Sequence, residues 1–122
     1  CGTMSGGTAV LQLAVLLRFS RTRLFFGADS FKGLPSPTVE DALPAGAWRK
    51  GSYASSRHNF EANLAKNNVF VQERLRVLEG YFADTLPTAP IGAIAFLRLD
   101  GDLYISTMDA LRALAECVGC AG

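Results

Sequence analysis

Two aspartates separated by a glycine follow the most apolar strand-like run of the sequence. Residues 94–99 read IAFLRL, which is typical of a buried parallel strand, and Asp100, Gly101 and Asp102 follow at once. In open α/β sheets, ligands bind outside the carboxyl ends of the strands. Carboxylates at that edge could therefore bind a hard metal ion or a substrate hydroxyl. The alternative is a turn with a helix cap, a role that aspartate also fills.

Another aspartate, Asp29, follows the apolar run RLFFGA (residues 23–28) and lies 22 residues beyond Gly7. Gly7 closes the segment GTMSGG (residues 2–7), which precedes an expected helix. Glycines at such a turn let the backbone approach a ligand, and the helix N-terminus favours negative charge. An acid about 20 residues further on binds ribose hydroxyls in Rossmann-like folds. The spacing is not G-x-G-x-x-G, and a turn or N-cap role for Asp29 is the alternative.

A third apolar run, residues 75–78, is followed by Glu79, Gly80, Tyr81, Phe82, Ala83 and Asp84. Tyr81 or Phe82 could flank an adenine ring, and Asp84 could accept a hydrogen bond from its amino group. Alternatively, Phe82 belongs to the core and Asp84 caps the turn. Glycines and acids at successive strand ends together predict a nucleotide-type site at one edge of a sheet.

The elements that would position these residues alternate along the chain. We expect strands at 23–28, 75–78 and 94–99, a helical turn at 82–86, and helices at 8–19, 55–67 and 106–117, the first capped by Thr8 and the last by Ser106. Alternating strands and helices predict an α/β fold with a parallel sheet. Residues 31–53, with Pro35, Pro37 and Pro44, read as a long loop, and loops of that length are usually functional or mobile.

Composition narrows the range of partners. The chain has 122 residues, is 49% hydrophobic and carries a net charge of +1, which fits one globular domain. Its basic residues are scattered, so we expect no nucleic-acid or membrane partner. The apolar run 9–17 is too short to span a bilayer and lacks signal-peptide flanks, which leaves the cytoplasm as the default location.

Cysteine and histidine are sparse. Cys117 and Cys120 have CxxC spacing, but without a second pair they and Cys1 read as reduced thiols rather than as zinc ligands. His58 is the only histidine. It is either a catalytic base or a solvated or capping side chain.

Four blocks in order resemble the macrocin O-methyltransferase (TylF) family: GTMSGG, ADSFKGLP (28–35), EGYFADTLP (79–87) and LRLDGDLYIST (97–107). The resemblance runs through essentially all 122 residues. It implies a Rossmann-like class I methyltransferase fold, with a parallel sheet in three α/β/α layers. It also implies an S-adenosylmethionine-dependent, magnesium-assisted enzyme that methylates a hydroxyl of a sugar or related natural product.

The resemblance also assigns roles to residues. Gly2, Gly6 and Gly7 fall on the glycine turn beside the methionine moiety of the cofactor. Asp29 falls on the residue that binds the ribose, and Ser30 and Phe31 fall on the same pocket. Tyr81 and Phe82 fall near the adenine, and Asp100 falls on the catalytic metal ligand. Where the family usually has a glutamate, this chain has Ile105. The family's first strand would precede Cys1, and the acids that complete its metal site would follow Gly122.

We therefore expect residues 1–122 to be a partial methyltransferase domain, truncated at both ends, with about half of a metal site and no activity by itself. Its partner would be a small-molecule substrate, and a homo-oligomer is conceivable. Two other hypotheses are an NAD-dependent oxidoreductase, which also needs an acid after a glycine turn, and a catalytically silent nucleotide-binding fragment.

Overall fold

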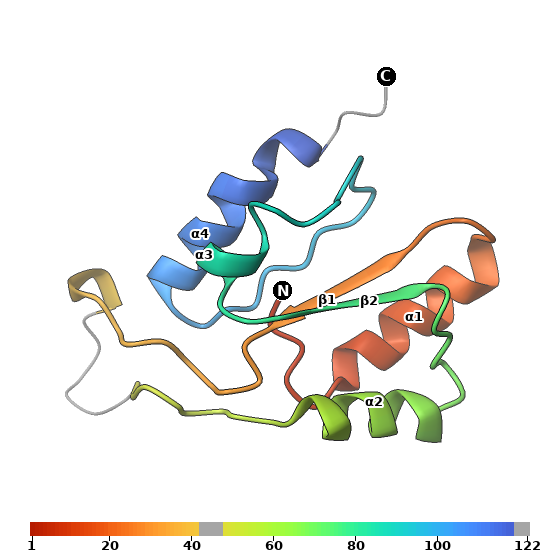
Figure 1. The fold of residues 1–122 in the computed structure, drawn as a ribbon, viewed down its shortest axis with the longest axis horizontal. Coiled ribbons are helices and arrows are strands. Elements are labelled where there is room, and N and C mark those ends of the chain that lie inside the picture. Colours follow the sequence, from red (N-terminus) through yellow and green to blue (C-terminus); the bar gives the residue numbers. More distant parts are fainter. Residues whose placement is uncertain (42–47, 119–122) are drawn as a thin grey trace.

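A pair of parallel strands forms the centre of the computed structural model, which describes residues 1–41 and 48–118. Strand β1 (Phe25–Asp29) pairs with β2 (Leu75–Glu79), Phe25 opposite Leu75 and Asp29 opposite Glu79. Helices α1 (Gly7–Phe19) and α2 (Arg57–Lys66) cover one side, and α3 (Phe82–Thr85) and α4 (Tyr104–Leu114) the other (Figure 1). Two short 3₁₀ turns are η1 (Val39–Asp41) and η2 (Ala115–Cys117). The predicted three-layer α/β/α arrangement is confirmed.

The strands send alternate side chains to two cores. Leu75 and Val77 pack with α1 and α2, where Leu13, Phe60 and Leu64 are completely buried. On the other face, Ala28 and Leu78 pack with residues of α4 that include Ala110 and Leu114. Each large apolar side chain buried in this way contributes roughly 1.5–3 kcal/mol, so both helical layers hold the strands in place.

Two predicted helix starts are wrong. Helix α1 begins at Gly7 after Gly6 in a left-handed conformation (φ 86°), so Thr8 lies inside the helix. Helix α4 begins at Tyr104, two residues before the predicted cap Ser106. Ser106 is buried, and a β-carbon on Gly101 would lie 2.8 Å from that of Ser106. Ser106 thus packs beneath the turn instead of capping the helix.

The predicted strand at 94–99 is also wrong. A single parallel bridge joins Ile94 to Val118, and Phe96 is 74% exposed. A groove of about 790 Å³ separates this segment from β1. Beside that groove, Cys1 donates to the Arg98 carbonyl (2.9 Å) and Gly2 to that of Ala28 (2.9 Å). A strand needs a neighbour along its length, and within the described residues this backbone finds one only at its two ends, near Val118 and near Cys1.

Some expectations concern residues at the margins of the described chain. Residues 42–47 of the predicted long loop, with Pro44, and Cys120 of the CxxC pair lie outside the described residues. Cys1 and Cys117 carry free thiols. Within residues 1–41 and 48–118, no helix has the length and apolar character needed to cross a membrane.

Candidate functional site

A cavity of about 450 Å³ opens at the edge where β1 and β2 end. This volume lies within the range of small-molecule sites. Its walls come from four segments: the turn before α1, the loop after β1, the turn between β2 and α3, and the residues that lead into α4. The predicted site residues on its wall are Gly2, Asp29, Ser30, Tyr81, Phe82 and Asp100.

Asp29 holds the glycine turn against the end of β1. One carboxylate oxygen accepts hydrogen bonds from the amides of Thr3 and Met4, both at 2.8 Å, and the other accepts one from Phe31 at 2.8 Å. The two carboxylate oxygens together have four lone pairs, and three of these already accept backbone hydrogen bonds. One lone pair is therefore free for a ligand hydroxyl, and a second hydroxyl would share an oxygen with a backbone amide. The turn and any ligand bound to Asp29 would thus be positioned by one residue.

The predicted glycines differ in their surroundings. A β-carbon on Gly2 (φ 75°) would lie 1.9 Å from the Asp100 carbonyl oxygen, so only glycine allows this close approach. A β-carbon on Gly6 would lie 2.8 Å from the Phe60 ring, whereas Gly7 has open space around it.

Three predicted site residues lie outside the cavity lining: Gly6, Gly7 and Phe31. Gly6 packs against the core, and Phe31 is 9% exposed, with its ring centroid 5.8 Å from that of Phe60. Their contact with a cofactor stays a prediction.

The turn after β2 contributes aromatic groups. Tyr81 and Phe82 line the cavity, and Phe82 also packs on the core beneath α4. Its core role is thus observed, and its contact with adenine stays a prediction. Asp84 lines the cavity as well and remains exposed. Flat, partly buried rings suit the face of a nucleobase.

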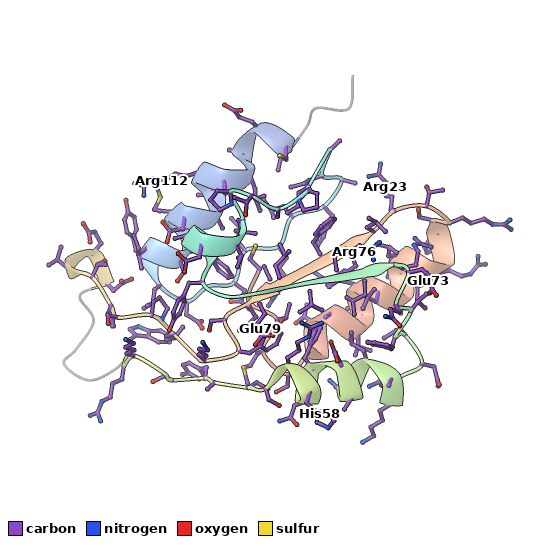
Figure 2. The ribbon with its side chains drawn as sticks, viewed as in Figure 1. Arg23, His58, Glu73, Arg76, Glu79 and Arg112 are labelled. Carbon is purple, nitrogen blue, oxygen red and sulfur yellow. The ribbon has the colours of Figure 1, made fainter. Side chains whose placement is uncertain are left out.

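His58 does not line the cavity. It is exposed on α2, in the outer helical layer (Figure 2). This position agrees with the solvated alternative.

Asp100 and Asp102 line the cavity from the segment that leads into α4. The half-exposed Asp100 carboxylate forms an ion pair with Arg98, which also donates to the Gly2 carbonyl at 3.1 Å. Burial, and then the negative charge of Asp100, raises the pKa of Asp102, while Arg98 opposes this shift.

Magnesium prefers oxygen ligands, and the two aspartates offer the right donor type. Within the described residues, however, no three histidine, cysteine or acidic side chains come together as a metal site. Asp100 would also have to exchange Arg98 for the ion. Residues 1–41 and 48–118 therefore supply part of a magnesium site at most.

Two residues of the long loop escaped prediction. Tyr53 lines the cavity, is 57% exposed and has a left-handed backbone (φ 59°), with its ring centroid 5.8 Å from that of Trp48. Asp41 binds the start of α4 from 63 residues away. Loop length pointed to this segment, but no local pattern identifies either residue, because both roles depend on distant contacts.

Known proteins resemble this chain in sequence and in fold. The family model described as Macrocin-O-methyltransferase (TylF) matches residues 1–122. Demethyldecarbamoylnovobiocin O-methyltransferase of Streptomyces niveus is 38% identical over 99% of this chain and 48% of its own length. Mycinamicin III 3''-O-methyltransferase of Micromonospora griseorubida is 32% identical over 90% of this chain and 46% of its own. The chain thus spans about half the length of these relatives.

Two solved structures are similar. The O-methyltransferase NovP has a TM-score of 0.79 and 37% identity, over 94% of this chain and 49% of NovP. The calicheamicin methyltransferase CalS11 has a TM-score of 0.77 and 24% identity, over 96% of this chain and 51% of CalS11, and shows the fold alone.

Proposed function

Because the chain belongs to the macrocin O-methyltransferase family, we propose that its cavity binds S-adenosylmethionine and that the full-length protein methylates a natural-product hydroxyl. The observation that carries this proposal is the cavity at the strand ends, which Asp29 and Gly2 line on one side and Tyr81 and Phe82 on another. Asp29 would accept the ribose hydroxyls, and the two rings would flank the adenine. The acceptor would be a sugar or a related compound, because a relative from Streptomyces olivaceus that is 37% identical is named for methylation of a rhamnosyl-tetracenomycin.

The methyl-transfer reaction depends mainly on how the cofactor and the acceptor hydroxyl are positioned. The sulfonium carbon–sulfur bond breaks as the acceptor oxygen bonds to the methyl group, and S-adenosylhomocysteine leaves. Because the methyl group is already activated, holding the two reactants in line can supply much of the rate. The hydroxyl proton must go to a base. Asp102, which lines the cavity beside Asp100, is our candidate for that base.

We propose further that Asp100 provides one ligand of a magnesium ion whose remaining ligands lie outside the described residues. The ion, when bound, would lower the pKa of the acceptor hydroxyl. In the full-length enzyme, Asp100→Asn should remove most methyl transfer but change S-adenosylmethionine affinity little, because the amide keeps the shape and loses the charge. Radiolabelled methyl transfer with and without chelator measures this. Metal-independent transfer by the native protein would contradict the magnesium assignment.

Cofactor binding tests the function itself. Isothermal titration calorimetry of the full-length protein should detect S-adenosylmethionine and S-adenosylhomocysteine in one site and no binding of NAD. Binding of NAD alone would favour an oxidoreductase. Binding of S-adenosylhomocysteine without any transfer to sugar-containing acceptors would favour a silent nucleotide-binding domain.

A further inference from the structure

The loop between β1 and α2 forms one wall of the cavity and is fixed at its base by its own backbone. Leu34 donates to the Ser52 carbonyl and accepts from the Gly51 amide, both at 2.9 Å. Gly33 (φ 83°) makes this closure possible, since a β-carbon there would lie 2.4 Å from the Gly51 carbonyl oxygen. These hydrogen bonds therefore fix the direction in which the backbone continues through the wall residues Leu34, Pro35 and Ser36.

Asp41 gives the same loop a second attachment. One carboxylate oxygen accepts from the Tyr104 amide at 2.5 Å, and the other accepts from the Thr38 amide and hydroxyl at 2.9 and 3.1 Å. Tyr104 is the first residue of α4, and its N-cap Leu103 offers no side-chain hydrogen bond. Asp41 thus supplies the missing cap, and its negative charge is favourable at a helix N-terminus. These hydrogen bonds lower the pKa of Asp41, so the carboxylate is charged near neutral pH.

The two residues joined by this bond do not line the cavity, but each adjoins a segment that does. Tyr104 follows the turn that carries Asp100 and Asp102, and Asp41 follows the wall segment 34–36. We propose that Asp41 is a positioning residue that holds the loop wall against the start of α4 and thereby slows release of the bound cofactor. This inference rests on the proposed function, since it takes S-adenosylhomocysteine as the occupant of the cavity.

Asp41→Ala in the full-length protein is the direct test, with S-adenosylhomocysteine as the probe. By stopped-flow measurement its dissociation rate should rise about tenfold while association changes little, because changes to one binding site act mainly on dissociation. Asp41→Asn keeps an oxygen for the Tyr104 amide and should largely restore slow dissociation. The matched control is Glu40→Ala, which removes a neighbouring exposed carboxylate and should leave both rates unchanged.

A second measurement does not need a ligand. Hydrogen exchange of the Tyr104 amide in the free protein should accelerate in Asp41→Ala and stay slow in Glu40→Ala. If the native protein binds S-adenosylhomocysteine but Asp41→Ala releases it at the native rate, the positioning role is wrong and the proposed function stands. If the native protein does not bind it at all, both are wrong.

Discussion

The Asp29 carboxylate binds backbone amides of the protein and, in our proposal, also the ribose of the cofactor. It already accepts three backbone hydrogen bonds, two of them from the glycine turn, and the proposed cofactor would add its ribose hydroxyls. Hydrogen bonds to a charged group typically contribute about 1.5–3 kcal/mol each, so the side chain matters with and without a ligand. Its position beside Gly2 means that the turn is held in place before any cofactor arrives.

Replacing Asp29 should therefore weaken cofactor binding. We expect Asp29→Ala to reduce S-adenosylhomocysteine affinity by about 1.5–3 kcal/mol. Calorimetry measures this, and thermal unfolding shows how much of the effect is loss of the turn. Glu73→Ala removes an exposed carboxylate far from the cavity and serves as the control. Native affinity in a folded Asp29→Ala protein would contradict the ribose assignment.

Helix α1 shows how neighbouring glycines of one element can have different roles. Gly6 precedes the helix in a left-handed conformation and faces the Phe60 ring, whereas Gly7, the first helical residue, faces open space. The element thus depends on Gly6 for its start and for its packing on α2. The proposed cofactor contact belongs to Gly2 on the cavity wall.

Gly6→Ala and Gly7→Ala form a matched pair. Gly6→Ala should lower the free energy of unfolding by at least about 1–2 kcal/mol, since an L-residue is strained in the left-handed region and its β-carbon would meet Phe60. Gly7→Ala should leave stability unchanged or slightly higher, because alanine favours helix. Urea unfolding of both variants tests this. Equal stabilities would show that Gly6 is not required by the fold.

The elements that the sequence predicted correctly are those whose signal is local. Strands β1 and β2 and helix α2 lie within a few residues of the expected ranges, because apolar spacing and flanking turn residues define them. The prediction of a strand at 94–99 was wrong, because strand formation depends on a neighbouring strand that sequence periodicity does not reveal. The predicted start of α4 was wrong for a similar reason, because its capping group comes from Asp41 in a distant loop.

The site residues divide in the same way: those with a local sequence signal were predicted, and those whose roles depend on distant contacts were not. Of the six predicted residues on the cavity wall, Asp29, Ser30, Tyr81 and Phe82 meet there because the carboxyl ends of the parallel strands β1 and β2 share an edge. Tyr53 and Asp41 could not be predicted, because their roles depend on where the long loop folds back.

At the scale of the whole molecule, the two helical layers leave a groove between β1 and residues 94–98. The Cys1 amine lies at one end of it and donates to Arg98. In a polypeptide that begins at Cys1, burial, followed by the charge of Arg98, lowers the pKa of this amine from 8.0 to about 6, against the opposing charges of Asp29 and Asp100. A buried ammonium at this junction therefore costs stability.

A polypeptide that begins at Cys1 should become more stable as the pH rises. Between pH 6 and 8 the unfolded amine binds a proton more readily than the folded one, so protonation favours unfolding. The free energy of unfolding should increase by about 2 kcal/mol between pH 6 and 8. Urea unfolding at both pH values measures it, and an N-acetylated polypeptide should lose this part of the dependence. The same slope in both would show that the amine is not responsible.

A crystal structure of the full-length protein with S-adenosylhomocysteine tests the central claim most directly. The ribose hydroxyls should lie within hydrogen-bond distance of the Asp29 carboxylate, with the adenine beside Tyr81 and Phe82 and the sulfur facing the wall that carries Asp100. A cofactor bound outside this cavity, or inside it without contact to Asp29, would contradict the account.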